Sequence, residues 1–99
     1  MLKINKNASG SKLTVALEGR LDTVTAPQLE GELKDSYEGV SELVMDIEKL
    51  EYISSAGLRV LLSAQKTMNK QGSMVVKNAS EEVKEIFEVT GFSDILTIE

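Results

Sequence analysis

The chain is 99 residues long, near the commonest size of a single folded domain and large enough for one hydrophobic core. Sixteen acidic residues against eleven basic ones give a net charge of −5, so nucleic-acid binding, which needs concentrated Lys and Arg, is not expected. The chain has no Cys and no His, which excludes disulfides, thiolate chemistry and most general-base arrangements.

A hairpin is predicted at the start of the chain. Leu2 and Ile4 indicate a short first strand, and "NASGSK" is typical of a turn because Asn, Gly and Ser tolerate the dihedral angles that turns require. Apolar and polar residues then alternate from Leu13 to Leu21, which is the period of a half-buried strand. We expect the two strands to pair with each other.

A helix start is predicted directly after this hairpin, in "TVTAPQLEGEL". Thr25 and Gln28 have the spacing of a capping box, in which each side chain satisfies a free backbone N–H of the other residue. Val24 and Leu29 flank that box as a hydrophobic staple would. Gly31 lies inside the predicted helix and weakens it by roughly 1 kcal/mol relative to Ala.

A buried strand and a long helix are predicted next. "ELVMDI" (42–47) is a short apolar run, typical of a strand that is covered on both faces. Leucines at mixed spacings of three and four residues follow the pair Ser54 and Ser55, and they predict a helix. Gly72 suits the left-handed end of that helix.

The last quarter of the chain repeats this alternation. "SMVVK" (73–77) is another short strand, and Ser80 can cap a helix that ends at Gly91. "DILTIE" (94–99) is interpreted as a final edge strand. A hairpin followed by alternating helices and strands is an α/β layer fold.

The two serines in "EYISSAGLRVLL" lie where a strand passes to a helix. If Ser54 is the N-cap, its oxygen accepts a hydrogen bond from a backbone N–H near Ala56 or Gly57. Ser55 then takes the first helical position, where its hydroxyl faces solvent, and the glycine lets another molecule approach the backbone. A helix N-terminus also favours an added phosphate. Two interpretations stay open at this point: serines that merely begin a helix, or a hydroxyl presented for modification.

Two carboxylates are expected near these serines. Asp22 follows "LEGRL" and Asp46 closes the run "LVMD", so each is predicted to end a strand. If those strands are parallel neighbours, both carboxylates emerge at the same sheet edge as the serines. An acidic pair beside a hydroxyl can bind a magnesium ion, or it can offer hydrogen-bond acceptors to a protein partner. Solvated loop acids are the simpler alternative.

"EGRLDTVTAPQLE" followed by "LVMDIEKLEYISSAGLRVLL" resembles a STAS domain, and more narrowly the small anti-sigma factor antagonists of bacteria. The joint pattern of G-x-L-D, A-P-x-L, a strand Asp and S-S-x-G-L carries the resemblance, which runs from about Leu2 to Ile98. Residues 1–99 are therefore predicted to be one STAS domain. The implied fold is an α/β mixed sheet of four or five strands with helices packed mainly on one side.

The resemblance also implies a function. In that family, a serine two residues before a glycine accepts phosphate from a partner that is both a serine kinase and an anti-sigma factor. The matching residue is Ser55, with Ser54 as the secondary candidate; Ser54 stands where the family usually has Asp, and Ala56 replaces a hydroxyl residue. The unphosphorylated domain would bind this kinase and free a sigma factor. Phosphorylation would end the binding, and a metal-dependent serine phosphatase would reset the switch.

The domain so implied is a ligand and a substrate rather than an enzyme, without catalytic residues, cofactor or metal. No segment has the roughly 18 consecutive apolar residues of a membrane span, and "MLKINKNASG" lacks a signal-peptide core, so we expect a cytoplasmic protein without membrane insertion. The surface expected to bind the partner comprises Asp22, Thr23, Asp46, Ser54, Ser55, Ala56, Gly57 and Arg59.

Three alternatives to this function stay open at this point. A STAS module of a larger sensory or transport assembly would bind partners without being phosphorylated. A receiver-like domain would take phosphate on Asp46, but the opening hairpin does not fit that fold. A small carboxylate hydrolase would have to work without His, which makes it the weakest of the three.

Overall fold

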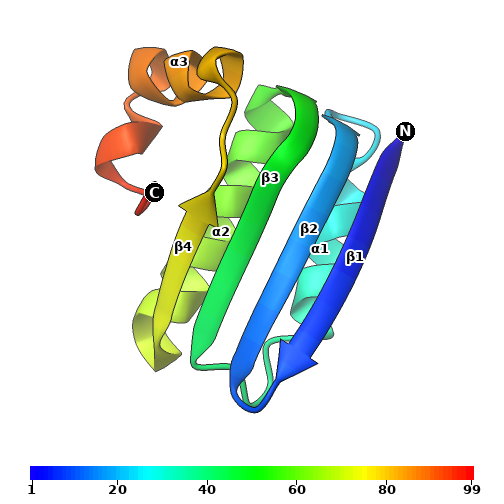
Figure 1. Cartoon of the computed structure of the whole chain (residues 1–99), viewed down its shortest axis with the longest axis vertical. Coiled ribbons are helices and arrows are strands. Elements are labelled where there is room, and N and C mark those ends of the chain that lie inside the picture. Colours follow the sequence, from blue (N-terminus) through cyan, green and yellow to red (C-terminus); the bar gives the residue numbers. More distant parts are fainter.

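A four-stranded mixed sheet forms the centre of the computed structural model, which describes all 99 residues (Figure 1). Strand β1 pairs antiparallel with β2, and β2, β3 and β4 run parallel to one another, so the spatial order follows the chain order. The predicted α/β class with a mixed sheet is confirmed. The strands are β1 (Leu2–Ser9), β2 (Lys12–Leu21), β3 (Glu42–Ile53) and β4 (Ser73–Lys77).

Helices α1 (Ala26–Lys34) and α2 (Ser55–Gln71) cover one face of this sheet (Figure 1). Helix α3 (Glu81–Thr90) follows β4 and lies beyond the carboxyl end of that strand (Figure 1). The side chains that fill the space between sheet and helices form one core, because alternate strand residues and one stripe of each helix are apolar. No helix combines the length and hydropathy needed to cross a membrane. Fully buried members of the core include Val15, Leu29, Ile47, Leu61 and Phe87.

The sheet has four strands because the predicted edge strand at 94–99 does not form. Residues Phe92–Asp94 make a short 3-10 turn instead, directly after the left-handed Gly91. Only Ile98 pairs with β4, as a single parallel bridge to Val76. Backbone hydrogen bonds on either side of Ile98 hold it there: Val76 donates to Thr97 at 2.8 Å, and Glu99 donates to Val76 at 2.9 Å.

The predicted capping box at the start of α1 is wrong. The Thr25 hydroxyl donates to the Arg20 carbonyl at 2.8 Å and accepts from the Asp22 N–H at 2.9 Å, so it is not free to cap the helix. Val24 is 84% exposed, so the predicted hydrophobic staple does not form either. The serine caps of the other two helices are confirmed: the Gly57 N–H donates to Ser54 and the Val83 N–H donates to Ser80.

Candidate functional site

The junction of β3 and α2 gives the two serines different roles. Ser54 has extended backbone (φ −96°, ψ 176°), and its Oγ accepts a hydrogen bond from the Gly57 N–H at 3.4 Å. Its own N–H donates to the Leu21 carbonyl at 2.9 Å, which ties the junction to the end of β2. Ser55 is the first residue of α2 and is exposed to solvent. The predicted division is therefore confirmed: Ser54 shapes the turn and Ser55 presents its hydroxyl.

Asp22 orders the loop that lies beside this junction. Its carboxylate accepts backbone N–H groups from Val24 at 3.0 Å and from Thr25 at 3.1 Å. The Thr25 N–H is the largest cause that holds the pKa of Asp22 below its ordinary value, while partial desolvation opposes it. Leu21 pairs with Ile53 at the ends of the parallel strands, so the Asp22 loop and the serine junction emerge next to each other.

The predicted position of Asp46 is wrong. Strand β3 continues to Ile53, so Asp46 lies in the middle of the strand and pairs with Ala16 on one side and Lys77 on the other. Eight residues separate it from Ser54, so at about 3.3 Å per residue roughly 25 Å of strand lies between Asp46 and the serines. The polar run after Ile47 is also strand, with an irregular register toward β2. Asp22 and Asp46 therefore cannot share a cation.

Asp46 instead contacts one polar group in its own strand and one just after the carboxyl end of β4. Its Oδ1 accepts the backbone N–H of Glu48 and the side-chain N–H of Asn78, both at 3.1 Å. Residues alternate between the two faces of a strand, and the neighbours Met45 and Ile47 are completely buried toward the helices. The carboxylate of Asp46 consequently lies on the sheet face that α1 and α2 leave uncovered.

The structure requires a glycine at position 57 for a different reason from the predicted one. It is buried, and a Cβ built on it would lie 2.7 Å from Leu21 and 2.9 Å from Ile53, so the glycine lets α2 pack closely onto the strand ends. We predicted that this glycine would let another molecule approach the backbone closely. Its burial excludes that role. The residue supports the serine junction from beneath.

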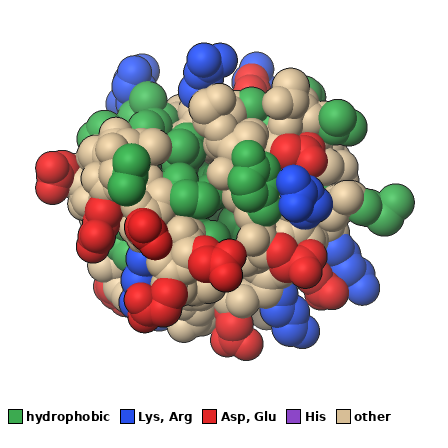
Figure 2. Space-filling view, turned by 90° about the horizontal axis from the view of Figure 1, so that it is seen from above, with side chains coloured by type: hydrophobic (Ala, Val, Ile, Leu, Met, Phe, Trp, Pro, Cys, Tyr) green, Lys and Arg blue, Asp and Glu red, His purple; other side chains and the backbone are tan.

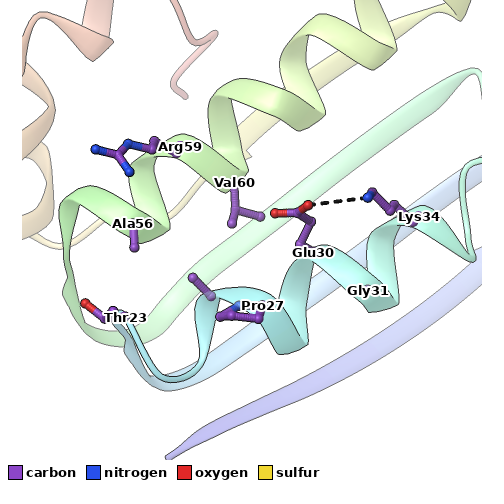
Figure 3. A pocket seen from close by; sticks show the side chains of 9 residues that line it. Thr23, Pro27, Glu30, Gly31, Lys34, Ala56, Arg59 and Val60 are labelled. Carbon is purple, nitrogen blue, oxygen red and sulfur yellow. Dashed lines mark ion pairs between the residues drawn. The ribbon is translucent and has the colours of Figure 1, made fainter.

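A groove between α1 and α2 brings three of the predicted residues together (Figure 3). It measures about 400 Å³, and Figure 3 shows it running from Thr23 and Ala56 at one end to Lys34 at the other. The guanidinium of Arg59 extends toward the first turn of α2 (Figure 3). The groove was not predicted, because the spacing between two helices cannot be derived from either helix alone. Its lining residues are Thr23, Ala26, Pro27, Glu30, Gly31, Lys34, Ala56, Arg59 and Val60.

The end of the molecule that carries the site has apolar side chains toward its middle and acidic ones along one side (Figure 2). Two exposed apolar residues adjoin the site in sequence: Val24 is 84% exposed and Tyr52 is 38% exposed. The Arg20 guanidinium lies 4.4 Å from the centre of the Tyr52 ring, a cation–π contact that joins β2 to β3. This contact could not be predicted from the sequence, because a register irregularity between Gly19 and Arg20 sets which residues face each other.

Comparisons with known proteins place this arrangement in a family. The model of the STAS domain matches residues 3–99. The chain is 35% identical over 99 residues to a Bordetella bronchiseptica protein named as an anti-sigma factor antagonist, BtrV, covering 98% of this chain and 85% of the relative. It is 29% identical over 98 residues to the anti-sigma-B factor antagonist of Bacillus subtilis, covering 98% and 90%.

Solved structures show the same fold at lower identity. An anti-sigma factor antagonist from Mycobacterium paratuberculosis superposes with a TM-score of 0.89 at 21% identity, over 99% of this chain and 85% of that chain. The Bacillus cell fate determinant SpoIIAA in its phosphorylated form superposes with a TM-score of 0.77 at 16% identity, over 98% and 91%. The family match over residues 3–99 and the relative at 35% identity lead to one conclusion: this chain belongs to the STAS domain family.

Proposed function

We propose that this protein is an anti-sigma factor antagonist that binds its anti-sigma factor through the junction at Ser55. The observation that carries the proposal is the exposed Ser55 hydroxyl at the first position of α2, beside a loop that Asp22 holds in order. Relatives that are 35% and 29% identical are named as antagonists of anti-sigma factors. The protein acts by binding and is itself the substrate of its partner.

The proposed switch is phosphorylation of Ser55 by the anti-sigma factor, acting as a serine kinase with Mg-ATP. Ser54 is the poorer acceptor because it is half-buried and its oxygen already accepts the Gly57 N–H. A phosphate at Ser55 adds about −1.5 to −2 charges at pH 7 to a chain whose net charge is −5. A metal-dependent serine phosphatase would restore the binding form, and the whole cycle would take place in the cytoplasm.

The proposed binding surface is contiguous around the junction. Exposed Thr23 and Arg59 and half-buried Ala56 surround Ser55, and Gly57 supports them from the core. Asp46 lies on the uncovered sheet face, so its predicted role would require a second contact of the partner there.

The test is phosphorylation by purified serine kinases of the histidine-kinase-like fold, taken from the genome that encodes this chain. We expect one of them to add a single phosphate to the wild type, and phosphopeptide mapping to assign it to Ser55. Ser54→Ala is the matched control and should still be phosphorylated, whereas Ser55→Ala should not be. Dominant phosphate on Ser54, or no phosphorylation by any such kinase, would contradict the proposal.

A further inference from the structure

Gly31 is the one glycine of this chain that the fold does not require. It has helical backbone in the middle of α1, and a Cβ built on it would meet no atom within 4 Å. Glycine inside a helix is destabilising relative to alanine, because it loses more conformational freedom on folding. The other six glycines either adopt a positive φ or lie where a Cβ would strike a neighbour: Gly10, Gly19, Gly39, Gly57, Gly72 and Gly91.

The open space at Gly31 belongs to the groove between α1 and α2. Pro27, Glu30, Gly31 and Lys34 follow one another at helical spacing along α1, and all four line the groove (Figure 3). Gly31 lies in the middle of this stripe, so a side chain there would narrow the groove without touching the core. Gly31 therefore destabilises α1, and its missing side chain leaves the middle of the groove open.

The charges around the groove differ from those of the chain as a whole. Glu30 pairs with Lys34 at 3.5 Å. The guanidinium of Arg59, by contrast, has no carboxylate oxygen of the chain within 4.0 Å of its nitrogens. A chain with net charge −5 thus holds an unpaired cation at the end of the groove nearest Ser55. Ala26, Pro27 and Val60 add apolar surface to a lining that also carries these charges.

We infer that this groove receives a short segment of the anti-sigma factor, in which an apolar side chain packs over Gly31 and a neighbouring carboxylate pairs with Arg59. The inference rests on the proposed function, because the groove opens at Ala56 and Arg59, one and four residues after Ser55. A partner bound at Ser55 therefore reaches the groove without a second docking event. Its segment supplies the acidic group that the chain itself does not provide for Arg59.

The test compares the affinity of the purified anti-sigma factor kinase, without ATP, for the wild type and for groove variants. Gly31→Leu fills the groove and should weaken binding by about tenfold, the effect of losing one well-seated contact of about 1.4 kcal/mol. Gly31→Ala should weaken binding less, while its thermal midpoint rises by about 4–8 °C because the helix is improved. Arg59→Glu should weaken binding by about tenfold or more, since it places like charges together.

Matched controls separate the groove from general effects. Gln28→Leu adds the same side chain to an exposed position of α1 that does not line the groove, and Lys3→Glu makes the same charge change on β1. Both should bind like the wild type. Ser55→Asp, measured in the same series, tests the proposed function independently of the groove.

The outcomes distinguish the two proposals. If Gly31→Leu binds like the wild type while Ser55→Asp binds weakly, the groove inference is wrong and the proposed function stands. If neither variant changes the affinity, or the kinase does not bind the wild type, both are wrong. Should Gly31→Leu fail to fold, Gly31→Ala and Arg59→Glu decide: wild-type affinity in both overturns the inference, and a more stable Gly31→Ala that binds less tightly supports it.

Discussion

The carboxylate of Asp22 does at the end of β2 what a capping side chain does at a helix N-terminus. It accepts two consecutive backbone N–H groups, from Val24 and Thr25, and the Asp22 carbonyl accepts the Ala26 N–H at 2.8 Å. Three donors at the start of α1 are thereby satisfied by one residue that precedes the helix. The loop beside Ser55 owes its order to this carboxylate: both N–H groups donate to its Oδ1, and an ionised acceptor holds them more strongly than a neutral carboxyl does.

Replacing Asp22 by Ala should therefore destabilise the protein in a pH-dependent way. The folded pKa of Asp22 is lowered, so its stabilisation is fully present above the unfolded pKa of about 3.9 and is lost as the pH falls through the folded value. The gap in thermal midpoint between wild type and Asp22→Ala should be widest at pH 6–7 and should narrow below about pH 4.

Glu51→Ala is the control for this pH series, because Glu51 is an exposed acid on β3. It should show a small gap at every pH. A gap between wild type and Asp22→Ala that stays constant from pH 7 to pH 2.5 would show that the loop does not depend on the ionised carboxylate.

Residues whose roles depend on near neighbours in the chain could be predicted from the sequence. The division between Ser54 and Ser55 follows from capping, which involves only the next three residues. Thr25 has the same local pattern, yet its hydroxyl donates to the Arg20 carbonyl, five residues back on a strand end. That acceptor exists only once the strand is placed, so the capping box was predicted wrongly.

At the scale of elements, the packing of α2 on the ends of β2 and β3 sets where the serines lie. The helix begins at Ser55 and reaches the core by its third residue, Gly57, which fits between Leu21 and Ile53. Both contacts are with branched side chains close to their backbones, so neither can move far without disturbing the core. The position of the Ser55 hydroxyl thus depends on the absence of a side chain two residues later.

Gly57→Ala should consequently destabilise the protein, by about 1–3 kcal/mol, which is the usual cost of overpacking a core by one methyl group. Helix propensity alone predicts the opposite sign for this change in stability, because alanine is more favourable than glycine inside a helix. Denaturant unfolding of Gly57→Ala and Gly31→Ala measures both effects. A stabilised Gly57→Ala would mean that the strand ends yield to α2 and that the junction is not held by this contact.

Elements with a clear apolar period were predicted well, and elements that end in polar residues were not. The hairpin, α2, β4 and α3 have the expected bounds to within a few residues. Strand β3 extends six residues beyond the predicted run 42–47, because Leu50 and Ile53 continue its buried face past a register irregularity. The 94–99 segment alternates like a strand, but the turn at Phe92–Asp94 leaves room for one bridge only.

At the scale of the whole molecule, the parallel arrangement of β2 and β3 brings the Asp22 loop and the serine junction together. Each strand is followed by a helix on the same face of the sheet, so both helices start at the same edge and the groove lies between them. This meeting of strand ends could be predicted from the alternation of strands and helices. The width of the groove could not be predicted from the sequence, because it depends on side chains of α1 and α2 together.

The last prediction separates folding from binding when Ser55 carries a negative charge. An anion at an exposed helix N-terminus is favourable by about 0.3–1 kcal/mol, and no acidic residue occupies the first turn of α2 to oppose it. The phosphorylated protein and Ser55→Asp should therefore melt at or slightly above the wild-type temperature. In the complex, the same charge loses its water without gaining a partner, which costs several kcal/mol.

Because each 1.4 kcal/mol is about tenfold in affinity, the phosphorylated protein should bind the anti-sigma factor at least about a hundredfold more weakly. Ser55→Asp carries a smaller charge and should show a smaller loss in the same direction, whereas Ser55→Ala should bind persistently because it cannot be phosphorylated. Calorimetric melting and the dissociation constant, measured on the same samples, decide the matter. A phosphorylated protein that melts well below the wild type, while its folded fraction keeps the original affinity, would mean that phosphate acts on the fold and not on the interface.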